Sequence, residues 1–257
     1  MGEFDVHLCS RGHSNGTHLS GFNMNSDIEH IKTQFEKLEP EGCDTWNPLS
    51  NDTELWHRLR LFTEMTHVLR FLKRDPHSIR VLDVGCGVGR SSRMLIELGV
   101  LPENITAIDF RDNAIDTARR LNPSINYSKI DSLKDWPEES FDLCIQCTAF
   151  SSIPGHKLRV ETACKMQNSV GMDGFVFWWD LINANDFAGG DHLSCKNLFS
   201  EMEIVYWKQV SLRPSFSEAS MSLPKAGRYF QKLLKRVPTR KTHLCALFSA
   251  INGGKSQ

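Results

Sequence analysis

The 257-residue chain lacks several features that would assign it to a functional class at once. It has no run of about 18 apolar residues, which excludes a membrane-spanning helix, and residues 1–25 have no apolar core typical of a signal peptide. The formal net charge is only −1, so no charge excess points to nucleic acid or to a membrane surface. Internal repeats and low-complexity tracts are also missing. This ordinary composition predicts a globular domain in the cytoplasm.

The eight cysteines show no pattern of disulfides or metal ligands. Most lie inside apolar runs, which predicts buried free thiols in a reducing compartment; these are Cys86, Cys144, Cys147, Cys164 and Cys245. Cys144 and Cys147 form a C-x-x-C pair, but residues three apart in a strand point to opposite faces. Near the N-terminus, Cys9, His13 and His18 belong to a polar stretch that predicts a flexible tail. The sequence therefore predicts no metal site.

The most informative segment is a short apolar run that contains Asp83 and leads directly into alternating glycines. The glycines are Gly85, Gly87 and Gly89. The run predicts a buried parallel strand, and the glycines predict a turn into a helix over about residues 91–98. Glycine suits this turn because a ligand can approach the backbone where no Cβ intrudes. The amide groups at the start of the helix would point toward that ligand.

A second acid strengthens this interpretation. Residues 105–109 form another short apolar run that ends in Asp109, about 20 residues beyond Gly89, the offset at which an acid meets ribose hydroxyls. The Gly-x-Gly-x-Gly spacing differs from that of dinucleotide enzymes, and Asp83 would repel a phosphate. Together these features resemble the first two motifs of the class I S-adenosylmethionine-dependent methyltransferases. The resemblance implies S-adenosyl-L-methionine as cofactor and disfavours an NAD or nucleotide-sugar oxidoreductase.

The resemblance also implies which residues hold the cofactor, because ligands of such sheets bind at the carboxyl ends of the strands. Asp83 would bind the methionine end. Gly85, Cys86 and Gly87 would form the turn that the cofactor approaches. Asp109 would accept hydrogen bonds from the two ribose hydroxyls.

Further cofactor-binding positions follow from the same resemblance. Phe110 follows the ribose-binding acid directly. Asp131 and Ser132 stand where the family reads the adenine amino group. Gln146 or Cys147, at the end of the fourth predicted strand, would lie beside the reactive methyl group.

Alternating strand and helix patterns predict a doubly wound α/β fold with a mostly parallel seven-stranded sheet, as in the Rossmann-like methyltransferases. Besides the run before Gly85, strands are predicted over residues 105–109, 125–130, 141–147, 175–180, 204–212 and 243–250. Helices are predicted over residues 113–121, 156–170 and 191–201, with a break at residues 171–174.

Two further helices are predicted ahead of the glycine turn, over residues 26–38 and 53–74. The apolar face of the first is Ile28, Ile31, Phe35 and Leu38. The stripe of the second is Leu55, Leu59, Phe62, Met65, Leu69 and Leu72. In the resembled fold such helices often cover the cofactor. The predicted organisation is a tail (1–25), covering helices (26–76), the methyltransferase domain (77–251) and a tail (252–257).

The last two predicted strands are joined by residues 213–241, too long for a tight hairpin, which predicts a lid. Within it, residues 225–236 form a basic amphipathic helix. One interpretation is a surface helix packed on the domain through its apolar stripe. The other is a lid that contacts a phosphorylated or lipid-linked acceptor at a surface. The expected assembly is a monomer or a homodimer.

Several strings also resemble one bacterial branch of the class I family. They are residues 146–153, 177–180 with Asn183 and Asn185, 198–200, 210–214 and 240–244. Members of that branch are often found with polysaccharide or natural-product pathways, which implies O-methylation of a glycan or small molecule. This chain has Trp179 where the branch more often has Tyr, and it lacks a Pro after the Asn pair.

Methyl transfer is an in-line displacement, which a base assists when the acceptor is a neutral hydroxyl. Asp180, at the end of the fifth predicted strand, is the first candidate for this base or for positioning the acceptor, followed by His156 and then His192. No Asp/Asn-Pro-Pro-aromatic string follows the fourth strand, which disfavours amide or nucleobase methylation. The alternatives are N-methylation of a small amine or amino sugar, and a non-catalytic domain that binds S-adenosylmethionine.

Overall fold

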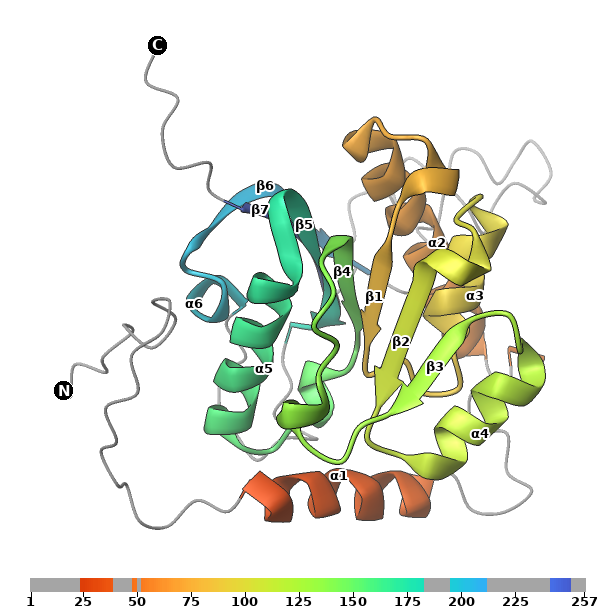
Figure 1. Cartoon of the computed structure of the whole chain (residues 1–257), viewed down its shortest axis with the longest axis vertical. Helices are drawn as coiled ribbons and strands as arrows, with labels where there is room; N and C mark the ends of the chain where they lie inside the picture. Colours follow the sequence, from red (N-terminus) through yellow and green to blue (C-terminus); the bar gives the residue numbers. More distant parts are fainter. Residues whose placement is uncertain (1–23, 39–47, 50–51, 183–194, 212–240, 251–257) are drawn as a thin grey trace, which may run out of the picture.

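The computed structural model describes residues 24–38, 48–49, 52–182, 195–211 and 241–250, and they form a seven-stranded sheet with helices on both faces (Figure 1). The predicted fold class is confirmed. The strands are β1 Val81–Val84, β2 Ile105–Asp109, β3 Asn126–Lys129, β4 Phe141–Cys147, β5 Val170–Leu181, β6 Met202–Val210 and β7 His243–Ala250. Their order is β3-β2-β1-β4-β5-β7-β6, and β7 is antiparallel to both neighbours.

The helices form two layers, because the inner strands bury most of their side chains on both faces of the sheet. The helices are α1 Met24–Leu38, α2 Asp52–Leu72, α3 Arg90–Glu97, α4 Asp112–Leu121, α5 His156–Ser169 and α6 Cys195–Leu198, with 3-10 turns at Pro76–Ser78, Pro102–Asn104, Leu133–Asp135 and Phe150–Ser152. One core cluster joins the sheet to α1 and α5. The other joins it to α2, α3 and α4.

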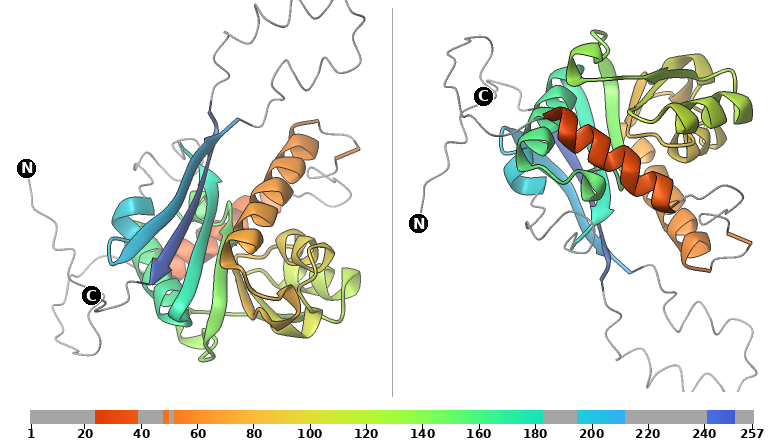
Figure 2. Two further views of the ribbon diagram at one scale, coloured as in Figure 1. Left: turned by 90° about the horizontal axis from the view of Figure 1, so that it is seen from above. Right: turned by 90° about the horizontal axis from the view of Figure 1, so that it is seen from below.

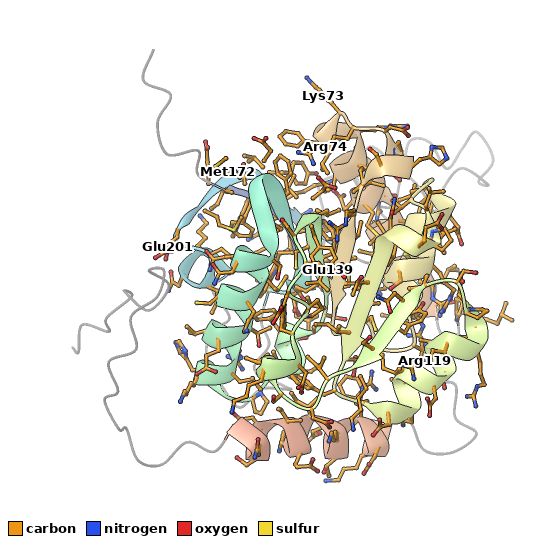
Figure 3. All side chains as sticks on the ribbon, viewed as in Figure 1. Lys73, Arg74, Arg119, Glu139, Met172 and Glu201 are labelled. Atoms are coloured by element: carbon orange, nitrogen blue, oxygen red, sulfur yellow. The ribbon has the colours of Figure 1, made fainter. Side chains whose placement is uncertain are left out.

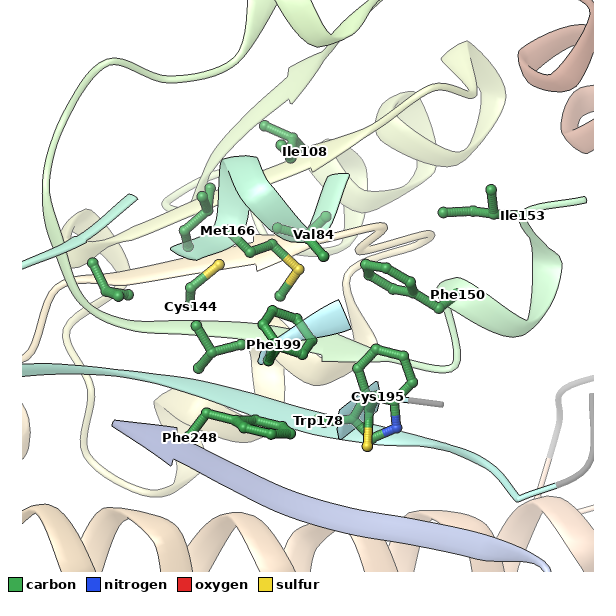
Figure 4. Packing of buried hydrophobic residues seen from close by; sticks show 14 of the residues in the cluster. Val84, Ile108, Cys144, Phe150, Ile153, Met166, Trp178, Cys195, Phe199 and Phe248 are labelled. Atoms are coloured by element: carbon green, nitrogen blue, oxygen red, sulfur yellow. The ribbon is translucent and has the colours of Figure 1, made fainter. Parts of the chain in front are cut away.

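Large aromatic side chains fill the first cluster (Figure 4). The Trp178 ring lies 4.8 Å from that of Phe150 and 5.9 Å from that of Phe199, measured between centroids. Such contacts add about 0.5–1.5 kcal/mol each to the burial term. This packing ties β5 to the loop after β4, and that loop forms part of the site described below.

Helix α1 lies across the carboxyl ends of the parallel strands (Figures 1 and 2). Phe35 on α1 stacks under the guanidinium of Arg111, which follows β2, at 3.9 Å. Lys73, Arg74 and Met172 lie at the opposite edge of the sheet, away from α1 (Figure 3). The N-terminal helix therefore covers the edge at which ligands bind in such folds.

The predicted face of α2 is partly wrong. Leu55 and Leu59 are 38% and 48% exposed, although the pattern placed both in the core. The buried face instead carries the acids Glu54 and Glu64 together with Leu61, Met65, Val68, Leu69 and Leu72. Glu64 accepts hydrogen bonds from Tyr206 (2.8 Å) and Lys208 (2.5 Å) on β6. Acids with hydrogen-bonded partners can be buried. The apolar pattern alone therefore predicted the wrong buried face for the first turns of α2.

The helix that begins at His156 ends before residues 171–174, as predicted, but these residues belong to β5, which begins at Val170 and not at Phe175. Val170 pairs with Phe141, and Phe175 pairs with Leu143. Between these two pairs, β5 therefore has more residues than the β4 segment that it faces. This irregularity has the form of a β-bulge, where glycine is common. Both β4 and β7 begin and end where the sequence predicts.

Four of the five cysteines predicted as free thiols are free: Cys86, Cys144, Cys147 and Cys245. The prediction is wrong for Cys164, which is disulfide-bonded. Among the described residues, no helix is long and apolar enough to cross a membrane. The predicted tails, the lid (213–241), its basic helix (225–236) and His192 lie outside the described residues, apart from the lid's last residue, Lys241, and the first tail's last two.

Candidate active site

A cavity of about 380 Å³ opens at the carboxyl edge of the sheet, below the glycine turn. Its walls come from α1, the first turns of α2, the loops after β1, β2, β3 and β4, the end of β5 and the start of β7. Of the predicted cofactor residues, six line it: Gly85, Cys86, Gly87, Asp109, Phe110 and Cys147. This is the size and position expected of a small-molecule site in a doubly wound fold.

The glycine turn requires backbone conformations that other residues rarely adopt. Gly85, Gly87 and Gly89 have φ of +68°, +54° and +74°. The amides of Gly85 and Cys86 both donate to the carbonyl of Ile108, at 2.9 and 3.1 Å, which fixes the turn against the end of β2. A Cβ at Gly85 would lie 2.6 Å from the Cβ of Ala149. Glycine is therefore needed here for packing against the β4 loop as well as for φ.

Replacing Gly85 with alanine is expected to destabilise the protein by about 2 kcal/mol, since the left-handed conformation alone costs about 1–2 kcal/mol. Gly171→Ala is the matched control, because its Cβ would meet only Ser140 Oγ, at 3.5 Å, and its φ is not positive. Urea denaturation of both variants measures the difference. Equal midpoints for the two variants would show that the turn is not constrained in this way.

Asp109 joins the glycine turn to the segment after β2. Its Oδ2 accepts a hydrogen bond from the Gly87 amide at 2.8 Å, and its Oδ1 accepts from the amide and Nε of Arg111 at 2.9 and 3.2 Å. The carboxylate is 8% exposed and faces the cavity. Three of the about four lone-pair sites of this carboxylate are used, so Oδ2 can accept one hydroxyl directly, and a second hydroxyl would have to share Oδ1 with the Arg111 groups.

Asp83 lies behind the turn and does not line the cavity. Its Oδ2 accepts hydrogen bonds from Ser91 (2.6 Å) and Ser92 (2.5 Å) at the start of α3. Its Oδ1 is buried and has no partner within the described residues. Burial raises its pKa to about 6, while the two serine hydroxyls act in the opposite direction. An unpartnered carboxylate oxygen under the turn fits the bound methionine end of the cofactor, reached through a water molecule.

The cavity continues into an apolar slot beside Phe110. Ile130, Leu133 and Trp136 line it with Phe110, and these three were not singled out in the sequence. These three residues follow β3 in a connecting segment that is otherwise polar. Apolar residues in such a segment are the sequence signal that could have identified them. The flat faces of an aromatic base such as adenine can pack between such apolar side chains.

Asp131 and Ser132 do not line the cavity. The Asp131 carboxylate is exposed and pairs with Lys129 at 2.7 Å; this hydrogen bond is the main cause that lowers its pKa. The Ser132 hydroxyl caps the following 3-10 turn by accepting from the Lys134 amide at 3.2 Å. Their cofactor role stays a prediction that the side-chain positions do not favour.

Gln146 and Asp180 lie one layer behind the cavity, where they hold the loop that follows β4. Gln146 Oε1 accepts from the Ala149 amide at 3.1 Å. Asp180 Oδ2 accepts from the amides of Phe150 and Ser151 at 3.1 and 3.2 Å. Asp180 is fully buried, and this burial raises its pKa to about 6. Its geometry is that of a residue that positions a loop.

The loop itself lines the cavity through residues 147–153. Thr148 has φ of +61°, which is unusual for a β-branched residue. Its amide donates to the Trp179 carbonyl at 2.7 Å. Strained residues of this kind cluster at functional sites. His156, the second catalytic candidate, is exposed at the start of α5 and does not line the cavity.

Two histidines that sequence reasoning missed also line the cavity, His57 on α2 and His243 at the start of β7. The Trp179 indole donates to His57 Nε2 at 2.8 Å. Burial lowers the pKa of His57 to about 4 and that of His243 to about 3, so both imidazoles are neutral at pH 7. Neutral imidazoles can accept as well as donate a hydrogen bond.

A charged cluster on α2 and α3 completes this wall. Glu54 is buried and pairs with Arg58 at 3.0 Å and Arg90 at 3.8 Å. One face of α2 lines the cavity, with residues spaced three or four apart. They are Glu54, His57, Arg58 and Leu61. That polar stripe is the sequence signal that could have identified this wall.

The residues around this site match a known family model. Residues 81–168 match a methyltransferase domain. The matched region contains the glycine turn, Asp109 and the β4 loop. It does not contain α1, α2 or the last two strands.

One curated relative is similar over part of the same region. Trans-aconitate 2-methyltransferase from Rhizobium rhizogenes (strain K84 / ATCC BAA-868) is 32% identical over 78 residues, 30% of this chain. The match spans 30% of the relative's own length. It supports the methyltransferase region of the chain.

Two solved structures share the fold over most of the chain. The N-methyltransferase NodS from Bradyrhizobium japonicum WM9, in complex with S-adenosyl-l-homocysteine, has a TM-score of 0.59 at 16% identity and covers 85% of this chain and 97% of its own. A TehB-like SAM-dependent methyltransferase from Corynebacterium glutamicum ATCC 13032 Kitasato has a TM-score of 0.51 at 16% identity and covers 88% and 99%. With the family match, these comparisons support S-adenosyl-L-methionine as the cofactor, as the sequence predicts.

Proposed function

We propose that this protein is an S-adenosyl-L-methionine-dependent methyltransferase that methylates a hydroxyl of a sugar, glycan or small natural product. The observation that carries the proposal is the single cavity that Asp109 and the glycine turn line together with His57 and His243. The family match over residues 81–168 supports the methyl-transfer chemistry. When bound, S-adenosyl-L-methionine supplies a methyl group on a positively charged sulfur.

The residues fit this cofactor from end to end. Asp109 would hold the two ribose hydroxyls, and the apolar slot at Phe110 would hold the adenine. The paired charges of Glu54 with Arg58 and Arg90 complement the ammonium and carboxylate of an amino-acid end. Cys147 and the β4 loop then border the reacting centre, from which α1 excludes water.

The acceptor end favours a neutral, polar acceptor. Its two imidazoles, His57 and His243, are neutral at pH 7. A hydroxyl fits this arrangement because it can both donate to and accept from a neutral ring nitrogen. The names of the relatives include a trans-aconitate methyltransferase and an N-methyltransferase, so a carboxylate and an amine are the alternatives to test.

Transfer of labelled methyl from S-adenosyl-L-methionine tests the proposal. The panel contains a methyl glycoside, glucosamine, trans-aconitate and fractionated host extract. We expect label on a hydroxyl of the glycoside or of an extract component. Label confined to the amine or the carboxylate would overturn the acceptor class, and cofactor binding without transfer to any fraction would favour a non-catalytic binding domain.

A further inference from the structure

The antiparallel strand β7 places a side chain at the acceptor end of the cavity. In parallel strands only the last residues reach the carboxyl edge of the sheet, whereas an antiparallel strand reaches it with its first residue. His243 begins β7 and pairs with Leu181 at the end of β5. Both residues line the cavity.

The imidazole of His243 is held firmly in place. It stacks on Trp179, with ring centroids 5.2 Å apart and planes 24° apart, and it lies 5.2 Å from the ring of His57. The side chain is 4% exposed. Its Nδ1 lies 3.1 Å from Thr242 Oγ1, and its Nε2 has no hydrogen-bond partner in the described part of the chain. Nε2 is therefore the nitrogen that an acceptor in the cavity can reach.

His57 cannot play the same part, since its Nε2 lone pair already accepts from the Trp179 indole. Its remaining proton must then lie on Nδ1, which is 3.9 Å from Glu54 Oε2. With its lone pair used in this way, His57 contributes one wall of the slot that holds the neighbouring ring. Trp179 contributes the other wall.

We propose that His243 Nε2 accepts the hydrogen bond of a neutral acceptor hydroxyl and takes its proton during methyl transfer, with His57 and Trp179 as positioning residues. This inference rests on the proposed function. A bond forms between the hydroxyl oxygen and the methyl carbon. The carbon–sulfur bond breaks, and its electron pair goes to sulfur. The proton goes to Nε2 and from there to solvent.

The low basicity of this imidazole is compatible with the role. Burial and the neighbouring His57 lower the pKa of His243, which keeps its lone pair free of protons at pH 7. The proton becomes very acidic once the oxygen has bonded to the methyl carbon, since a protonated ether is a far stronger acid than an imidazolium. A carboxylate acceptor carries no such proton, so the same residue would be dispensable for it.

The kinetic test compares His243→Phe, which keeps an aromatic ring against Trp179, with the unmodified protein. On the hydroxyl acceptor that takes label, we expect kcat to fall about 100-fold, with KM and the affinity for S-adenosyl-L-homocysteine changed less than about threefold. Added imidazole should restore part of the rate of His243→Gly. An unchanged kcat, or an equal loss of S-adenosyl-L-homocysteine affinity, would overturn the proposal.

An acceptor-independent measurement uses nitrogen-15 NMR of the imidazoles in the full chain with saturating S-adenosyl-L-homocysteine at pH 7. We expect His243 to be neutral, with its proton on Nδ1 donated to Thr242 and a free lone pair on Nε2. A proton on Nε2 would overturn the base role even if methyl transfer is confirmed. Failure of S-adenosyl-L-homocysteine to bind would instead refute the proposed function.

Discussion

Replacing Asp109 with asparagine is expected to weaken binding of S-adenosyl-L-methionine about 1000-fold. The two hydrogen bonds from ribose hydroxyls to a carboxylate contribute about 1.5–3 kcal/mol each, and an amide can offer only one acceptor oxygen in their place. The variant also leaves Arg111 without its ion pair at 3.2 Å. Isothermal titration calorimetry with S-adenosyl-L-homocysteine, which avoids turnover, measures the loss.

Asp116→Asn is the matched control, because Asp116 is an exposed acid on α4 that pairs only loosely with Arg119, at 3.7 Å. Exposed pairs of this kind contribute about 0–1 kcal/mol, so its affinity should match that of the unmodified protein. Thermal unfolding shows whether Asp109→Asn is still folded. A folded Asp109→Asn protein that binds S-adenosyl-L-homocysteine normally would mean that Asp109 serves only to fix the glycine turn through Gly87.

The glycine turn and the position of Asp109 at the cavity were predictable because they depend on residues that are close in the sequence. The positive φ of Gly85 and Gly87 follows from glycine in a strand-to-helix turn. Asp109 follows from an acid at the end of the next strand. In both cases one strand and its adjoining turn determine where the side chain lies, so no long-range information is needed.

The acceptor end depends on topology that a linear pattern does not contain. His243 reaches the cavity only because β7 runs antiparallel. His57 and Glu54 reach it because α2 turns a polar stripe toward the sheet, and that rotation depends on paired acids. Apolar periodicity therefore predicted the existence of α2 and placed its Leu55 and Leu59 on the wrong side.

The sequence also predicted that every polar residue at a strand end lies at the site. In the structure, some of these side chains face the cavity and others lie behind it. Cys147 faces the cavity, whereas Gln146 and Asp180 point away from it and bind the amides of the β4 loop. Alternation along a strand makes this difference inevitable for neighbouring residues. Which of the two faces the ligand depends on register, and a single sequence does not reveal register.

Four buried groups around the site with shifted pKa values, Asp83, Asp180, His57 and His243, predict an unusual dependence of stability on pH. Burial raises the pKa of Asp83 and Asp180 to about 6 and lowers that of His57 to about 4 and of His243 to about 3. Between pH 4 and 6 each of these acids holds a proton only when folded, so its contribution to stability falls as pH rises. Each histidine holds a proton only when unfolded, so its contribution increases as pH rises. In the unmodified protein the two pairs oppose each other.

Removing one of the acids should therefore change the pH dependence of the unfolding free energy in one direction, and removing one of the histidines should change it in the other. Relative to the unmodified protein, the unfolding free energy of Asp180→Asn should rise by about 1.4 kcal/mol per pH unit between pH 4 and 6, and that of His243→Gln should fall by the same amount. Urea denaturation at pH 4, 5 and 6 measures both slopes, which separate the two variants by about 5 kcal/mol over that range. Parallel profiles would show that these groups titrate alike in the folded and unfolded chain.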